Sequence, residues 1–269
     1  MKRYLTTTAR FWSASIAAEM EYRANFIMSA LGSVMVLVGS VFTLGLFYQH
    51  DYQMGGWSWP QAMIVIAIYT VLDGFQAMLL APNRTQVTEL VREGTLDFVL
   101  LKPIDTQYWL SVRKLSIWGA PNVVLGLALL VWAMTRLDTF PSPGSIALGA
   151  VAIVLGMVAL YALGYILSTL TIWFVKLFNV TMAMQALLEA GRYPIAAYPI
   201  AYQVFFTFIL PVAFMTTVPA QAILGDAGGS SAAGVAGWIA GSFVVALALL
   251  LVSHAFWRFA MRYYTSASS

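Results

Sequence analysis

The sequence has no cysteine, only two histidines and very few charged residues. Without cysteine the chain can form neither a disulfide nor a thiolate metal site. Charged residues make up 9% of its 269 residues, whereas hydrophobic residues make up 61% and the mean hydropathy is +0.80. A soluble domain of this length needs far more charge to cover its surface. The composition therefore excludes a soluble globular protein and indicates a polytopic membrane protein.

Motifs of the common enzyme classes are also missing. The sequence contains no H-E-x-x-H, no G-x-S-x-G and no cluster of His, Asp and Glu with metal-ligand spacing. It also lacks the G-x-x-x-x-G-K-[ST] loop, so we do not expect the chain to hydrolyse ATP by that route. We therefore expect no catalytic, cofactor-binding or metal-binding residue in this chain, which is not itself an enzyme, and no nucleic-acid partner.

Long apolar runs dominate what remains. A membrane-spanning helix needs about 20 apolar residues, and the alternating pattern of a membrane barrel is absent. The sequence thus predicts an all-α fold in a six-span domain over residues 24–269. The expected spans are residues 24–48, 60–80, 115–134, 145–172, 196–217 and 233–256.

The basic residues predict how these spans are oriented. With six spans, both termini lie on one side, and every lysine and arginine except Arg136 falls on that side or within its loops. Short loops rich in lysine and arginine stay in the cytoplasm. We therefore expect a multi-pass protein of the cell (inner) membrane with both termini cytoplasmic.

Three further segments are expected to be helical or interfacial. Residues 1–23 carry apolar side chains at near-helical spacing, which favours a helix lying in the membrane interface, in contact with lipids. Residues 145–190 are too long for one span, so we expect a break near Trp173 and a helix over 177–191 near the cytoplasmic interface. Glycines at positions 149, 156 and 164 predict a face for close helix packing.

Asp73 is the only formally charged residue within the expected spans. An acid at membrane depth suggests a proton or ion site. A single carboxylate without a basic partner is, however, weak support for a relay that carries protons or ions across the membrane. A structural hydrogen bond, for example to Asn122, is favoured slightly. Polar or aromatic residues at membrane depth that could line a transport path are Asp73, Gln76, Asn122, Tyr161 and Tyr165.

Between the second and third spans, residues 82–114 form an unusually charged loop. Pro82 and Asn83 are typical of a helix start and Gly94 of a helix end, so two short cytoplasmic helices should flank this glycine. A plain connector would not need the apolar residues 96–101. The pattern therefore favours a compact element that docks on a soluble partner.

The stretch "VTELVREGTLDFVLLKPIDTQYW" resembles the loop after span two in membrane permease subunits of type-2 ATP-binding-cassette (ABC) exporters. The run "GRYPIAAYPIAYQVFFTFILPVAFMTTVPAQAILG" resembles the fifth-span signature of one permease subfamily in that group. This resemblance implies a dimer with a second permease, identical or related. It also implies a dimer of cytoplasmic ATPases that bind ATP and Mg.

In that family the loop carries a coupling helix that sits in a groove of the ATPase, and the N-terminal helix is an elbow helix. The segment 219–226 corresponds to short external re-entrant helices before span six. By the resemblance, the residues in contact with the ATPase are Glu89, Arg92, Glu93, Gly94, Thr95, Leu96, Asp97, Lys102 and Pro103.

Together these patterns predict the permease subunit of an ATP-driven exporter. Spans almost free of charge favour an amphipathic, lipid-like or hydrophobic cargo over a small ion. Two other interpretations stay open at this point: a secondary carrier or channel that uses Asp73, and a membrane anchor without a transport path.

Overall fold

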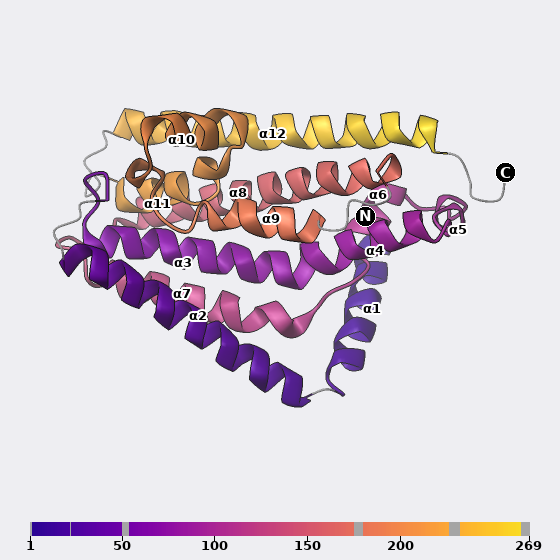
Figure 1. Cartoon of the computed structure of the whole chain (residues 1–269), viewed down its shortest axis with the longest axis horizontal. Coiled ribbons are helices and arrows are strands. Elements are labelled where there is room, and N and C mark those ends of the chain that lie inside the picture. The colour runs from indigo at the N-terminus through magenta and orange to yellow at the C-terminus, as the bar shows by residue number, and fades with distance from the viewer. Residues whose placement is uncertain (1, 22, 50–53, 175–179, 226–231, 265–269) are drawn as a thin grey trace.

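The computed structural model describes residues 2–21, 23–49, 54–174, 180–225 and 232–264. Within these ranges every regular element is a helix, and the only β-pairing is an isolated bridge between Met54 and Trp57. Figure 1 shows the long helices running side by side. The predicted all-α fold class is thereby confirmed.

The helices cover most of the described chain. The α-helices are α1 (Lys2–Glu19), α2 (Arg23–Gln49), α3 (Trp59–Phe75), α4 (Ala81–Arg92), α5 (Asp97–Leu100), α6 (Thr106–Val112), α7 (Ala120–Met134), α8 (Pro143–Thr169), α9 (Val180–Glu189), α10 (Ile200–Val204), α11 (Thr217–Leu224) and α12 (Ala232–Tyr263). The 3-10 or π-helical turns are η1 (Gln76–Leu80), η2 (Ile117–Gly119), η3 (Leu170–Ile172), η4 (Ile195–Ala197), η5 (Phe205–Ile209) and η6 (Val212–Phe214).

Five helices in the described chain are long and apolar enough to cross a membrane, and a bent pair would be a sixth candidate only if it counted as one span. The five are Arg23–Gln49, Trp59–Arg92, Ile117–Met134, Pro143–Ile172 and Ala233–Tyr263. This number and the helical architecture match the predicted polytopic membrane protein.

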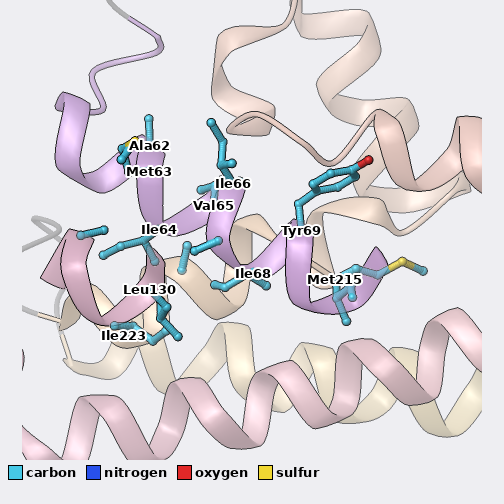
Figure 2. Packing of buried hydrophobic residues seen from close by; sticks show 14 of the residues in the cluster. Ala62, Met63, Ile64, Val65, Ile66, Ile68, Tyr69, Leu130, Met215 and Ile223 are labelled. Atoms are coloured by element: carbon cyan, nitrogen blue, oxygen red, sulfur yellow. The ribbon is translucent and has the colours of Figure 1, made fainter. Parts of the chain in front are cut away.

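α3 is the central helix of the bundle. Its side chains from Ala62 to Leu72 are almost all buried, and Figure 2 shows several of them packed with side chains from neighbouring helices. α7 comes close enough for backbone contact, because a Cβ on Gly126 would lie 2.8 Å from the backbone nitrogen of Val71. Glycine at this position therefore lets the two helices approach each other.

The glycines of α8 also mark contact points with other elements. A Cβ on Gly149 would meet Ile223 of α11, and one on Gly156 would lie 3.1 Å from the backbone of Met215. A Cβ on Gly164 would lie 3.0 Å from the guanidinium of Arg84. The predicted close packing is therefore confirmed at Gly149 and Gly156, whereas Gly164 faces only the side chain of Arg84.

The fifth crossing of the bundle lies upstream of the expected span at 196–217. Trp173 stacks near Phe256 and Tyr263 at the C-terminal end of α12. Ala196 lies against Gly55, in the loop before α3, at the opposite end of the bundle. The chain therefore crosses between Trp173 and Ala196, and α9 forms part of this crossing instead of lying at the cytoplasmic interface.

Residues 200–224 then enter the bundle and leave it at the same end. Ile200–Ile209 and Val212–Leu224 are bent by 74° at the break between them. The segment starts just after Ala196, and it ends at Gly225, which packs against Ser145 near the start of α8. A re-entrant hairpin thus takes the place of the span expected at 196–217, which was predicted to be kinked or partly unwound at Pro199 and Pro211.

The second span extends beyond its expected end without a break. Trp59–Arg92 forms one continuous helix that contains the π-helical turn η1, whereas a new helix was expected to start at Pro82. Proline has no N–H to donate to the carbonyl four residues earlier. The backbone N–H of Ser116 donates to that carbonyl, on Met78, at 2.8 Å. The segment before α7 therefore supplies the hydrogen bond to the Met78 carbonyl that Pro82 cannot make.

α1 runs across the ends of the spans rather than along them (Figure 1). The indole of Trp12 donates to the carbonyl of Val112 at 2.9 Å. Glu19 accepts from the backbone N–H of Ile117 at 2.6 Å, and Thr8 shares a 2.6 Å hydrogen bond with Tyr108. α1 is thus fastened to α6 and to the start of the third span, and its contact with lipid stays a prediction.

Candidate functional site

The chain after the second span forms a compact projection, residues 89–103, which we call the knob. α4 ends at a glycine with the left-handed φ of 68° that Gly94 adopts easily. The N–H of Gly94 donates to Val91 at 3.3 Å and that of Thr95 donates to Leu90 at 3.0 Å. These two bonds are the Schellman pattern of helix C-caps, and they turn the chain into α5.

The inner side of the knob is apolar and buried. Leu96 and Val99 are 0% and 3% exposed, and they belong to a cluster with Val87, Leu110 and Trp257. Leu96 was expected to contact the partner directly. It supports the knob from beneath instead, because its side chain is covered by the bundle.

The outer side combines exposed apolar and charged groups. Phe98 and Leu101 are 69% and 82% exposed, although both are large hydrophobic residues. Of the remaining residues expected at the contact, Arg92, Glu93, Lys102 and Pro103 are exposed, whereas Glu89, Gly94, Thr95 and Asp97 are half-buried. Sequence reasoning placed Phe98 and Leu101 in the knob but did not assign them to the contact.

Polar and aromatic contacts hold the knob on α6. Asp105 caps this helix by accepting from the backbone N–H of Tyr108 at 2.7 Å. The ammonium group of Lys102 and the guanidinium of Arg113 each lie 4.3 Å from the ring centroid of Trp109. Partial burial lowers the pKa of Arg113 from its ordinary value. The knob is therefore a supported element rather than a loose connector.

A second cluster of polar groups lies among the spans, around Asp73. One carboxylate oxygen of Asp73 accepts from the side-chain amide of Asn122 at 2.6 Å, and the other accepts from Gln185 at 3.0 Å. Gln76 donates to Gln185 at 2.9 Å. The structure thus brings together Asp73, Gln76 and Asn122 of the candidate transport path. α9 adds Gln185 to this cluster, a residue that the sequence analysis did not identify.

The cluster continues one α3 turn away with charged groups that the sequence reading did not place there. Tyr69 donates to Glu189 at 2.6 Å, and Arg192 donates to Tyr69 at 2.9 Å. Arg192 also forms an ion pair with Glu189 and donates to Ser40 of α2 at 3.3 Å. Arg192 was counted among the cytoplasmic basic residues, but it lies beside the middle of α3. The fifth crossing therefore brings its own ion pair into the bundle.

Tyr161 and Tyr165 lie apart from Asp73, on the part of α8 that faces α4 and α6. The hydroxyl of Tyr161 shares a 2.8 Å hydrogen bond with Ser111. The ring of Tyr165 packs edge-on against Trp257, with ring centroids 5.3 Å apart. The five candidate path residues thus divide into two separate groups.

A sequence profile of ABC-2 family transporter proteins matches residues 34–268. The matched range contains the knob, the polar cluster and all the helices from α3 to α12. The chain belongs to the ABC-2 transporter family. Members of this family are membrane permeases of ABC transporters, which work with an ATP-hydrolysing partner. No curated protein and no solved structure matches the chain. By its family, the ABC-2 permease described here is a membrane transport subunit.

Proposed function

We propose that this ABC-2 permease is moved by cytoplasmic ATPase subunits that dock on the knob and bind ATP and Mg. The main support is the exposure of Phe98 and Leu101 on a well-packed element. Phe98 and Leu101 are both exposed in the same short projection as the charged Arg92 and Glu93, and an apolar patch with a polar rim is typical of a binding surface. The buried Leu96 and Val99 keep the element rigid enough to transmit a push.

Contacts around the knob support a route by which a displacement of the knob by the ATPase would reach the spans. α4 continues α3 as one helix, so a displacement of the knob moves the central helix. The side chain of Asn83 donates to the carbonyl of Lys114 at 2.7 Å and accepts from its N–H at 2.9 Å. Ser116 and Ile117 bond to Met78 and Glu19. η1 and α4 are thereby linked to the segment that leads into α7, and this segment is linked to α1, at one point behind the knob.

The proposed cargo is an amphipathic, lipid-like or hydrophobic compound, exported by a dimer of this permease with an identical or related one. Support comes from the apolar surfaces of α2 and α12, where large exposed side chains include Met35, Phe42, Phe243 and Leu251. Such faces suit lipid, an apolar cargo or a second permease. In this proposal the knob faces the cytoplasm, as the distribution of basic residues predicts.

A secondary carrier that uses Asp73 has less support. Both carboxylate oxygens of Asp73 already accept a hydrogen bond from an amide side chain, Asn122 or Gln185. An ion-coupling site needs a carboxylate that exchanges its partners for the ion. The bonded arrangement favours a structural role that holds α3, α7 and α9 together.

The docking proposal predicts that replacing the exposed apolar residues on the outer side of the knob by carboxylates abolishes binding of the ATPase. In the double variant Phe98→Asp/Leu101→Asp, two apolar contacts become carboxylates, and we expect at least a tenfold loss of ATPase recovered with the permease in mild detergent. Burial of two large side chains at an interface is worth about 3 kcal/mol or more. Recovered ATPase is measured by quantitative immunoblot.

Phe140→Asp is the matched control, because Phe140 is 62% exposed at the opposite end of the bundle. We expect this variant to retain its ATPase. Unchanged ATPase recovery with the double variant, inserted in the membrane at normal levels, would contradict docking at the knob.

A further inference from the structure

The start of α3 and the loop after α7 meet at the end of the bundle opposite the knob (Figure 1). A cavity with a volume of about 210 Å³ lies between them. This volume is well above the ~30 Å³ that one water molecule occupies in the liquid. Polar atoms form more of the wall than apolar atoms do, and the polar lining residues are Ser58, Gln61, Arg136, Asp138 and Thr139. The cavity is therefore a candidate site for a small polar group.

Arg136 brings a positive charge to a part of the chain that has no other. It is the only lysine or arginine in the connections at this end of the bundle, residues 50–58, 135–142 and 225–231. Its guanidinium lies 5.1 Å from the ring centroid of Trp132 in α7. This cation–π contact orients the guanidinium but leaves its charge in place. No ion pair found in the described chain involves Arg136, so its charge is available to an anion.

Asp138 lines the same cavity and carries the opposite charge. Its side chain is exposed, and within the described residues it forms no ion pair with Arg136. A guanidinium binds phosphate through two parallel N–H bonds, and a carboxylate accepts hydrogen bonds from an ammonium group. A ligand that contains both a phosphate and an ammonium therefore matches the two charges of this cavity.

The surroundings of the cavity suit a lipid. Trp59, the first residue of α3, packs edge-on against Trp132, with ring centroids 5.8 Å apart. Tryptophan is enriched at the level of the lipid headgroups. From there towards the knob end, α7 exposes the apolar side chains of Val131, Leu127 and Val124. Residues spaced three or four apart share one face of a helix, so acyl chains can follow this face below a bound headgroup.

We propose that this cavity binds the headgroup of a phosphatidylethanolamine lipid. Arg136 binds the phosphate, Asp138 accepts hydrogen bonds from the ammonium, and the acyl chains lie along the exposed face of α7. The quaternary ammonium of phosphatidylcholine has no N–H to donate, and the headgroup of phosphatidylglycerol has no cation for Asp138. Lipid binding at this end needs neither ATP nor an ATPase, so its test is independent of docking at the knob.

Native mass spectrometry of the full chain in mild detergent measures this binding. Phosphatidylethanolamine, phosphatidylcholine and phosphatidylglycerol with the same acyl chains are each titrated into the wild-type permease. We expect phosphatidylethanolamine to bind about tenfold more tightly than either of the others, because each of them loses the charge-assisted hydrogen bonds to Asp138.

Two variants separate the roles of the charges. Arg136→Gln should weaken phosphatidylethanolamine and phosphatidylglycerol alike, because both lipids carry the phosphate. Asp138→Asn should weaken phosphatidylethanolamine about tenfold and should not weaken phosphatidylglycerol. Arg258→Gln is the control, since it removes an exposed arginine from α12 near the knob end, and it should bind all three lipids as the wild type does.

The wild type alone can contradict the proposal, whatever the variants do. Equal affinity for the three lipids would overturn it, and so would an Asp138→Asn variant that keeps the preference for phosphatidylethanolamine. Soluble glycerophosphoethanolamine carries the same headgroup without acyl chains. It should compete only weakly, and competition as strong as that of the lipid would identify a soluble zwitterion as the ligand and overturn lipid binding.

Discussion

Asp73 lies where α3, α7 and α9 meet, and its two oxygens are bonded to Asn122 and Gln185. If this role is structural, Asp73→Asn should keep the ATPase activity of the purified complex and change the unfolding free energy by about 1 kcal/mol. Asp73→Leu leaves the side-chain N–H groups of Asn122 and Gln185 without their acceptor and should cost about 2 kcal/mol or more. Denaturant unfolding and ATPase assays measure the two effects.

The carrier hypothesis makes the opposite prediction at the same residue. It requires proton or ion flux into proteoliposomes without ATP, and Asp73→Asn should abolish that flux. A pH-sensitive dye inside the vesicles reports proton entry directly. ATP-independent flux that this substitution removes would contradict a structural role for Asp73 and the proposed ATP-driven mechanism.

At the residue scale, the sequence led to Asp73, Gln76 and Asn122 because polar residues in apolar spans stand out. It did not lead to Gln185 or Arg192, although both are polar. Their neighbours mix apolar and charged residues, which is also typical of a cytoplasmic helix. Only the path of the fifth crossing shows that these side chains turn towards α3.

The shape of the knob depends on the turn between α4 and α5. Gly94 has a φ of 68°, and a residue with a Cβ is destabilised there by about 1 kcal/mol. Gly94→Ala should therefore loosen the Schellman cap, with amide exchange several-fold faster over residues 91–101. Hydrogen-exchange mass spectrometry measures this change.

Thr88→Ala on the preceding helix is a suitable comparison, because it removes a side-chain hydroxyl while its backbone stays helical. Exchange over residues 91–101 should differ little from that of the wild type in this variant. Equal protection in Gly94→Ala and the wild type would show that the left-handed turn does not determine the shape of the knob.

At the element scale, long apolar runs predicted α2, α7, α8 and α12 well, because lipid leaves no alternative to a helix. The residues after α8 were harder to interpret. Here Pro199 and Pro211 interrupt one apolar run, while α9 is short and mixed in composition. Hydropathy therefore favoured a span at 196–217. Packing of α9 against the centre of α3, through Tyr69 and Glu189, shifts the crossing upstream.

At the scale of the whole molecule, the permease is a bundle around α3 with a rigid extension at one end. The extension consists of α4, the knob and α6, and α1 is bonded to it across the ends of the spans. The buried Arg84 stands at its base. Composition alone predicted the membrane class, and the charged loop predicted a partner. The supporting contacts could not be predicted, since they join residues far apart in the chain.

The most direct test of docking at the knob uses the absence of cysteine from the sequence. Leu101→Cys introduces the only thiol of the permease at a site that is 82% exposed. Cross-linking with a short thiol-to-amine reagent, followed by mass spectrometry, should join residue 101 to an ATPase subunit. Phe140→Cys at the other end should not cross-link to it. A residue 101 thiol that reacts with the reagent but never joins an ATPase would contradict the account.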